Sequence, residues 1–260
     1  MQKIDKNASF IFFSALLFVN LVFDAYLYTL PNHTTIWNYL VNFTYGIIFI
    51  LGGLNAIRLC FKAGFTLSSL LGKTVISISL GLISWGVGLQ IWMYYNIFLH
   101  VAVPYPSVAD FFLPLFYFFV ALGTIPLIKL YAKAITPRII AESIVIIIFF
   151  ASIVFYVTRP DISTQLPFII KFLNAFYPLG SAFLISFAVI ILRISGIGIR
   201  KSLPFFIVGL ALHAIASLIY GYQAGNNTYW NGGPVDLTMM FAVFFLSIGL
   251  VKIIWEFKSI

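Results

Sequence analysis

The chain has 260 residues, of which 62% are hydrophobic and only 8% are charged. Soluble domains are about half apolar and about a quarter charged, and so few charges cannot cover a surface exposed to water. The composition therefore excludes a soluble enzyme. One membrane-spanning helix uses about 20 apolar residues, so the roughly 160 that are present predict an all-α, polytopic membrane protein with about eight spans.

Eight transmembrane helices are predicted by a hydropathy window of about 19 residues. The segments between them are short and contain the helix breakers proline and glycine. The first apolar run is too long for a signal peptide, which predicts that it is retained as the first span. In chain order the spans are Ser9–Leu30, Trp37–Cys60, Thr74–Phe98, Ser107–Leu130, Thr136–Val157, Pro167–Ile194, Lys201–Tyr222 and Val235–Phe257.

Lysine and arginine alternate between the two sides of this arrangement. One side receives only Arg159 and Lys171, and the other receives the remaining thirteen. The positive-inside rule then predicts a multi-pass protein of the cytoplasmic membrane with both termini in the cytoplasm. Topology and attraction to anionic lipids explain the net charge of +8, so it does not indicate nucleic-acid binding. The thirteen are Lys3, Lys6, Arg58, Lys62, Lys73, Lys129, Lys133, Arg138, Arg193, Arg200, Lys201, Lys252 and Lys258.

The two halves of the chain, 1–132 and 133–260, resemble each other. Their last spans read DFFLPLFYFFVALG at Asp110–Gly123 and DLTMMFAVFFLSIG at Asp236–Gly249, with Asp, Phe-Phe and Gly in register. Because each half has four spans, the halves keep the same orientation, which predicts a parallel duplication about an axis along the membrane normal.

The other spans contribute to this similarity to different degrees. The third spans, GLISWGVGLQIWMYY from Gly81 and GLALHAIASLIYGYQ from Gly209, share Gly-Leu and an aromatic residue after Ile. The second spans share Asn-x-x-Tyr, at Asn42–Tyr45 and Asn174–Tyr177. Apolar sequences also resemble one another by chance, and duplication builds helical bundles of any function, so a repeat alone indicates no activity.

The sequence VPYPSVADFFLPLFY at Val103–Tyr117 resembles a pattern in the N-terminal membrane regions of bacterial and archaeal signalling proteins. In that pattern a P-x-P-S-x-A-D turn opens a helix that ends in L-x-x-Y, and a diguanylate cyclase, phosphodiesterase or histidine-kinase domain follows. The stretches Asn174–Gly180 and Pro234–Asp236 look like further elements of those regions. The resemblance implies a sensory or ligand-binding module. With no output domain expected after the eighth span, the module would act through a separate membrane or cytoplasmic signalling partner.

Two other functions stay open beside this one. Parallel duplication and intramembrane polar residues are also typical of a small-solute or ion transporter or channel with a site between the repeats. An accessory subunit of a larger membrane complex is the third possibility, because no soluble domain is predicted. The sequence contains no Walker A, HExxH or GxSxG pattern and a single cysteine, Cys60, so no enzyme, metal site or cofactor is predicted.

Ionisable residues within spans are candidate functional residues because burying them in lipid is costly. Asp24 and Lys171 are predicted at similar depth, at about 1.5 Å per residue from the ends of their helices. We expect them to form a buried ion pair, with a ligand- or proton-responsive site and separate snorkelling of Lys171 as alternatives. His213, mid-span beside small residues, is expected to be a packing residue, and haem ligation would need a second histidine at its depth.

Asp110 and Asp236 fall in the first turns of their predicted helices, and Ser107-x-x-Asp110 has the spacing of a capping box. We expect helix capping, with a shared cation site as the alternative. Asn174 and Tyr177 precede Pro178, which is expected to kink its span and free backbone carbonyls. Arg138 and Glu142 are four residues apart, the spacing of a local ion pair on one helix face.

Overall fold

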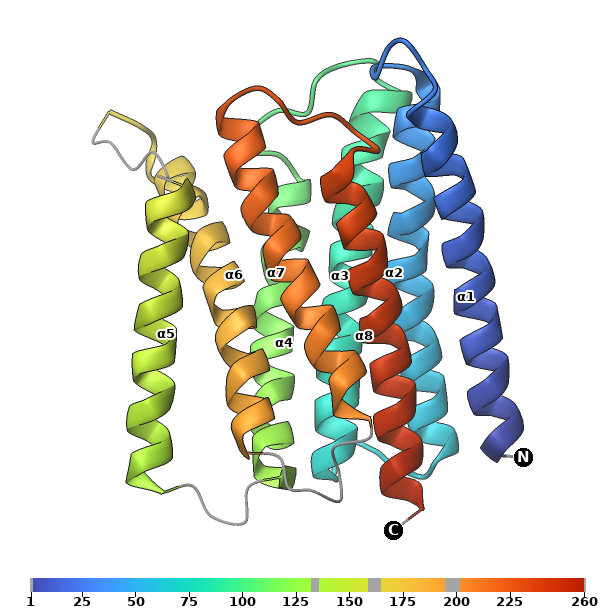
Figure 1. Ribbon diagram of the computed structural model, residues 1–260, viewed down its shortest axis with the longest axis vertical. Coiled ribbons are helices and arrows are strands. Elements are labelled where there is room, and N and C mark those ends of the chain that lie inside the picture. The colour runs from blue at the N-terminus through green and yellow to red at the C-terminus, as the bar shows by residue number, and fades with distance from the viewer. Residues whose placement is uncertain (1, 132–135, 159–164, 195–201, 260) are drawn as a thin grey trace.

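The computed structural model describes residues 2–131, 136–158, 165–194 and 202–259, and these form a bundle of eight long helices (Figure 1). Each helix is long and apolar enough to cross a membrane, so the predicted fold class is confirmed. The helices are α1 (Gln2–Leu27), α2 (Ile36–Lys62), α3 (Leu70–Ile97), α4 (Ala109–Tyr131), α5 (Pro137–Thr158), α6 (Phe168–Ile194), α7 (Leu203–Gly225) and α8 (Pro234–Lys258).

Local capping explains where some helices begin. The Ser69 side chain accepts a hydrogen bond of 3.0 Å from the amide of Gly72, so α3 begins at Leu70 rather than at the predicted Thr74. Helix α2 begins after a capping box formed by Thr35 and Asn38.

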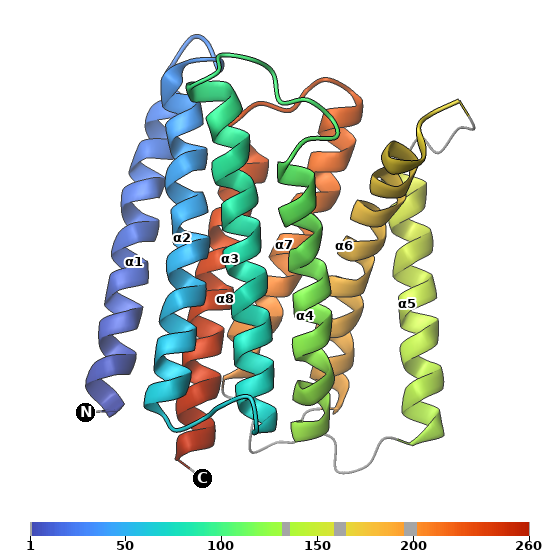
Figure 2. The same cartoon turned by 180° about the vertical axis from the view of Figure 1, so that it is seen from behind.

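Six of the described helices close into a ring through their contacts. Going round, α2 packs on α3, α3 on α4, α4 on α6, α6 on α7, α7 on α8, and α8 on α2. Helix α1 lies outside the ring against α2 and α8, and α5 lies outside it against α6 and α7, at opposite edges of the bundle (Figures 1 and 2). Both termini lie at one end, here called the terminal end, and the opposite end is called the far end.

Two pairs of ring helices approach closely at glycine. A Cβ on Gly123 of α4 would lie 2.6 Å from Cγ1 of Ile78, and a Cβ on Gly249 of α8 would lie 2.7 Å from the backbone nitrogen of Phe206. Small residues let membrane helices pack backbone to backbone. These glycines therefore set the spacing of α3 from α4 and of α7 from α8.

Apolar side chains cover the outside of the bundle as well as its interior. On α5, Val145, Ile148 and Phe149 are each more than half exposed. A soluble protein could not expose such a continuous surface, whereas lipid tails solvate it without cost. The outer surface thus fits contact with a bilayer.

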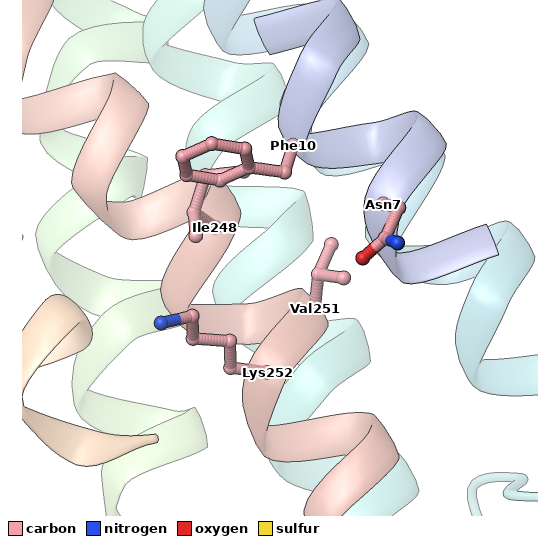
Figure 3. Close-up of a pocket in the computed structure, with 5 residues that line it drawn as sticks. All are labelled: Asn7, Phe10, Ile248, Val251 and Lys252. Atoms are coloured by element: carbon pink, nitrogen blue, oxygen red, sulfur yellow. The ribbon is translucent and has the colours of Figure 1, made fainter. Parts of the chain in front are cut away.

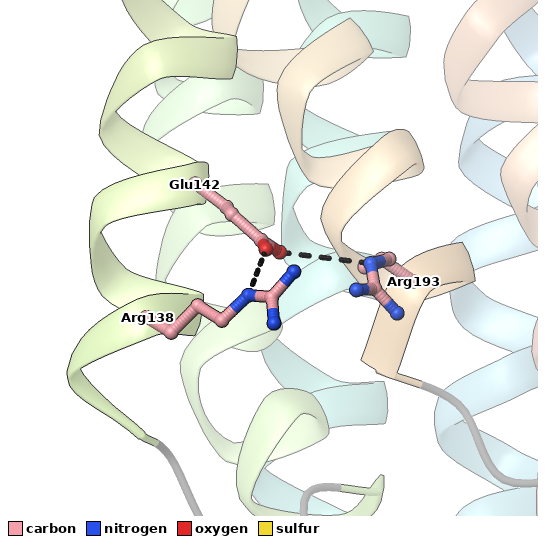
Figure 4. Close-up of polar contacts among 3 residues, drawn as sticks. All are labelled: Arg138, Glu142 and Arg193. Atoms are coloured by element: carbon pink, nitrogen blue, oxygen red, sulfur yellow. Dashed lines mark hydrogen bonds and ion pairs between the residues drawn. The ribbon is translucent and has the colours of Figure 1, made fainter.

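Charged contacts join α5 to α6 at the terminal end (Figure 4). The predicted Arg138–Glu142 ion pair is confirmed, with Nε 2.8 Å from the carboxylate. Arg193 of α6 approaches the same carboxylate to 3.6 Å, a contact between helices that the spacing did not predict. The positions Lys133, Arg159, Arg200 and Lys201, and the turn at 160–161, lie outside the described residues.

Candidate functional site

A buried carboxylate, Asp236, sits at the far end, where α8 begins. Its oxygens accept hydrogen bonds from the Tyr45 hydroxyl at 3.0 Å, the Tyr229 hydroxyl at 3.1 Å and the Gly232 amide at 2.7 Å. Gly232 adopts a φ of +81°, which favours glycine and turns its amide toward the carboxylate. Asp236 therefore ties α8 to α2 and to the loop before α8, in addition to the expected capping role.

Asparagines of α2 hold the same loop in place. The Asn42 side chain donates to Oδ1 of Asn231 at 2.8 Å and accepts from the Gly232 amide at 3.1 Å. Asn38 donates to the Asn231 carbonyl at 3.0 Å. Burial and the nearby charge of Asp236 raise the pKa of Tyr229, so its hydroxyl stays a proton donor in this cluster.

A second carboxylate, Asp110, forms a similar cluster where α4 begins. Its Oδ2 accepts from the amide and hydroxyl of Ser107 at 2.7 and 3.1 Å, so Asp110 binds the turn before its helix, as the capping spacing predicted. Its Oδ1 accepts from the Tyr177 hydroxyl of α6 at 2.7 Å. Nearby, the Tyr105 hydroxyl donates to Oδ1 of Asn174 at 2.7 Å. Asp110 thus joins α4 to α6 as Asp236 joins α8 to α2.

The structure brings together two of the stretches on which the family resemblance rests. Tyr105 and Asp110, from Val103–Tyr117, bond to Asn174 and Tyr177, from Asn174–Gly180. In the same two stretches, a Cβ on Gly180 would lie 2.6 Å from the Tyr117 ring. The small residues that follow Pro178 therefore serve close packing of α6 on α4.

Asp24 of α1 is a third buried carboxylate at the far end. It is 3% exposed, and its Oδ1 has no hydrogen-bond partner among the described residues. It interacts electrostatically with Asp236, and burial together with the charges of these two aspartates raises the pKa of Tyr28, which follows α1. The ion pairs found in the described part of the chain involve Glu142 and reach none of these aspartates.

The predicted pairing of Asp24 with Lys171 is wrong. Lys171 lies in the first turn of α6, and α6 is separated from α1 by the helices of the ring (Figures 1 and 2). Equal depth does not decide which helices are neighbours, and here α1 packs against α2 and α8. The carboxylate near Asp24 is Asp236, which carries the same charge.

Aromatic rings of two loops cover this region. The Trp230 ring stacks on His33, with centroids 4.0 Å apart, and the Tyr28 and Trp230 rings pack edge to face, with centroids 5.4 Å apart. Leu27, one turn after Asp24, lies against Gly232, where an added Cβ would meet Cδ1 of Leu27. The far end of α1 is thereby packed beneath the loop that carries the donors to Asp236.

His213 fills the centre of the ring, as a packing residue should. It is fully buried and stacks on Phe116 at 4.2 Å, with the Trp85 ring at 4.5 Å. Its Nδ1 lies 3.4 Å from the Ser217 hydroxyl, and its Nε2 has no partner among the described residues. His33 belongs to a far-end loop, so it does not supply the second histidine that haem ligation would need.

A cavity of about 170 Å³ lies between α1 and α8 near the terminal end (Figure 3). Its walls are mostly apolar, and the ammonium of Lys252 points away from Asn7 and lies 3.3 Å from the Phe205 ring centroid. The described residues contain no group of three or more histidine, cysteine or acidic side chains able to hold a metal. The far-end carboxylates are therefore the better candidate site.

Comparisons with protein-family models, with curated proteins and with solved structures found no match for this chain. The resemblance to signalling-protein membrane regions stays a prediction that rests on the quoted residues. Sequence reasoning singled out Asp24, Asp110 and Asp236 but missed the donors Tyr45 and Tyr229. The recurrence of Asn-x-x-Tyr in the second and sixth spans was the signal that could have identified Tyr45.

Proposed function

We propose that the protein is a sensory, ligand-binding module of the membrane that binds a cation at the far end and acts through a partner protein. The observation that carries this proposal is the pair of buried carboxylates, Asp24 and Asp236, beside which no described basic side chain forms an ion pair. The partner is inferred from the family resemblance, because in those signalling proteins the membrane region is followed by an output domain that receives its signal.

The chemistry of the pair favours a cationic ligand. A buried carboxylate is costly unless it is hydrogen-bonded or neutralised, and two that repel one another are costlier. The donors around Asp236 satisfy its oxygens, whereas Oδ1 of Asp24 is left without a donor. The rings of Tyr28 and Trp230 lie at the same end, and aromatic rings attract organic ammonium groups as well as metal cations.

The centre of the bundle favours binding over transport. Trp85, His213 and Phe116 pack against one another in the middle of the ring, and Phe49 and Tyr117 lie beside them. A solute crossing the ring would have to displace these rings. The transporter hypothesis therefore requires a large rearrangement, while a far-end binding site requires none.

Thermal unfolding of the full chain in neutral-lipid nanodiscs tests the proposal. Sodium, calcium and choline chloride are compared at matched ionic strength. A bound probe at 100 times its Kd stabilises the folded state by about 2.7 kcal/mol, so one of these cations should raise the melting temperature above the others. Asp24→Asn should abolish that difference. Glu256→Gln, which removes a carboxylate at the terminal end, should preserve it.

The same variants separate the proposal from its alternatives. Stabilisation that is equal for all three salts, or unchanged in Asp24→Asn, would contradict a cation site at this pair. Flux of the stabilising cation through proteoliposomes would instead favour the transporter hypothesis.

A further inference from the structure

The contacts around the ring come in matched pairs. Each helix of the first half corresponds to the helix four places later in the second half, so α2 corresponds to α6, α3 to α7 and α4 to α8. The contact α2–α3 then corresponds to α6–α7, α3–α4 to α7–α8, and α4–α6 to α8–α2. Every one of these pairs is in contact. The outer helices follow the same rule, because α1 packs on α2 and α5 packs on α6. A half-turn about the centre of the ring exchanges each of these contacts with its counterpart.

Residues that correspond in the two halves meet each other at the centre. With Gly81 and Gly209 in register, Trp85 corresponds to His213, and their rings are 4.5 Å apart. Trp92 and Tyr220, which also correspond, have centroids 6.3 Å apart. A residue near a two-fold axis must contact its own counterpart, so these two contacts locate such an axis between α3 and α7.

The close approaches at Gly123 and Gly249 obey the same register. Ile78, which meets Gly123, and Phe206, which meets Gly249, each lie three residues before their register glycine, Gly81 or Gly209. The contact between α3 and α4 is thus made at the place where α7 meets α8.

The far-end hydrogen bonds cross between the halves in both directions. Tyr45 of the first half bonds to Asp236 of the second, and Tyr177 of the second bonds to Asp110 of the first. Both tyrosines belong to the Asn-x-x-Tyr motif, and both aspartates open the aligned last spans. The asparagines of the motif also form hydrogen bonds between the halves. Tyr105 of the first half donates to Asn174 of the second, and Asn42 of the first half lies 3.4 Å from the Tyr229 hydroxyl of the second.

We propose that the halves are related by a pseudo-two-fold axis along the helices, and that the crossed Tyr45–Asp236 and Tyr177–Asp110 bonds are two equivalent clasps that hold the far end closed. Either clasp restrains the same motion, a separation of one half from the other at the far end. Breaking one weakens the restraint, and breaking both removes it. This inference does not depend on a cation binding at Asp24.

Spin-label distances in the full chain test the clasps. Labels are placed at the corresponding exposed positions Phe98→Cys and Asn226→Cys, which follow α3 and α7, in a Cys60→Ala background. Tyr45→Phe and Tyr177→Phe each remove one hydroxyl and keep the ring. Each should lengthen and broaden the distance distribution to the same degree, and the double variant should lengthen it further, by about 2 Å or more, the scale of domain rearrangements.

The controls make each outcome decisive. Tyr26→Phe, at an exposed tyrosine of α1, should leave the distances unchanged. Distances that respond to only one of the two clasp variants, or to neither, would overturn the proposal. If a phenylalanine variant does not fold, Asp110→Asn and Asp236→Asn make the same comparison from the other side of each bond. No cation probe is added, so failure of the proposed function would not affect this result.

Discussion

The buried aspartates at the far end differ in how their charge is accommodated. Asp110 accepts hydrogen bonds from Ser107 and Tyr177, and Asp236 accepts them from a backbone amide and two tyrosines. Hydrogen bonds to a carboxylate are strong because the acceptor is charged. Oδ1 of Asp24 has no such donor in the described chain, which is why the proposed site lies at Asp24 and the neighbouring Asp236 rather than at Asp110.

The environment of Tyr105 predicts that the free energy of unfolding depends on pH above the ordinary pKa of tyrosine. Burial and the charge of Asp110 raise the pKa of Tyr105 to about 12. Since tyrosine in an unfolded chain ionises near pH 10, the folded state retains this proton between about pH 10 and 12 and the unfolded state does not. This contribution to the free energy of unfolding is present below about pH 10 and is lost as the pH rises toward 12.

Melting temperatures measured across this interval check the expectation. Tyr105→Phe should lose less stability between pH 10 and about 12 than the wild-type chain, because phenylalanine has no hydroxyl proton to release. The exposed Tyr26 offers a matched control, and Tyr26→Phe should keep the wild-type slope. Equal slopes in Tyr105→Phe and the wild type would show that Tyr105 does not carry the effect.

Individual residues show what sequence could and could not predict about the site. The hydrogen bonds from Ser107 to Asp110 were predictable because both partners lie within one helical turn. The partner of Asp24 was not, because depth along a helix says nothing about the direction in which neighbouring helices lie. The donor Tyr45 lies 191 residues from Asp236 in sequence, and only the packing of α2 on α8 brings it to the carboxylate. Tyr229 lies seven residues before Asp236, and the fold of the loop before α8 turns its hydroxyl to the same carboxylate.

At the scale of helices, composition and breakers were enough to predict all eight spans, whereas their contacts required the structure. Apolar residues face both lipid and core in a membrane protein, so no amphipathic stripe marks the neighbouring helix. Glycine gives a partial signal. Gly123 and Gly249, which are aligned in the predicted repeat, lie where α4 packs closely on α3 and α8 packs closely on α7.

Enlarging these glycines should therefore destabilise the bundle. The Cβ of Gly123→Ala would meet Ile78 and the Thr74 carbonyl, and that of Gly249→Ala would meet the backbone of Phe206. Overpacking of this kind costs about 1–3 kcal/mol. Unfolding in detergent with increasing denaturant should show the loss in both variants.

Gly225 supplies the control for this comparison. A Cβ there would have open space around it, so Gly225→Ala should be neutral or slightly stabilising. A loss for Gly225→Ala as large as for Gly123→Ala would mean that the glycines act through helix propensity and not through close packing.

At the scale of the whole molecule, the two halves match in the contacts between neighbouring ring helices and differ in the contacts of their outer helices. Helix α1 packs against α8 as well as α2, whereas α5 packs against α6 and α7. This places Asp24 beside Asp236, while the outer helix of the second half contributes no acidic partner to Asp110 in the described structure. The proposed cation site is thus expected once per chain, although the clasps occur twice.

The orientation of the whole molecule in the membrane is predicted from the number of lysines and arginines on each side. Thirteen of fifteen lysines and arginines fall on the side that carries both termini, so the terminal end should face the cytoplasm. In a Cys60→Ala background, Leu67→Cys between α2 and α3 and Val108→Cys before α4 place comparably exposed thiols at opposite ends, at 60% and 57% exposure. An impermeant maleimide added to intact cells should label position 108 and reach position 67 only after the cells are permeabilised. Labelling of position 67 in intact cells would reverse the orientation, and the Asp24–Asp236 site would then face the cytoplasm.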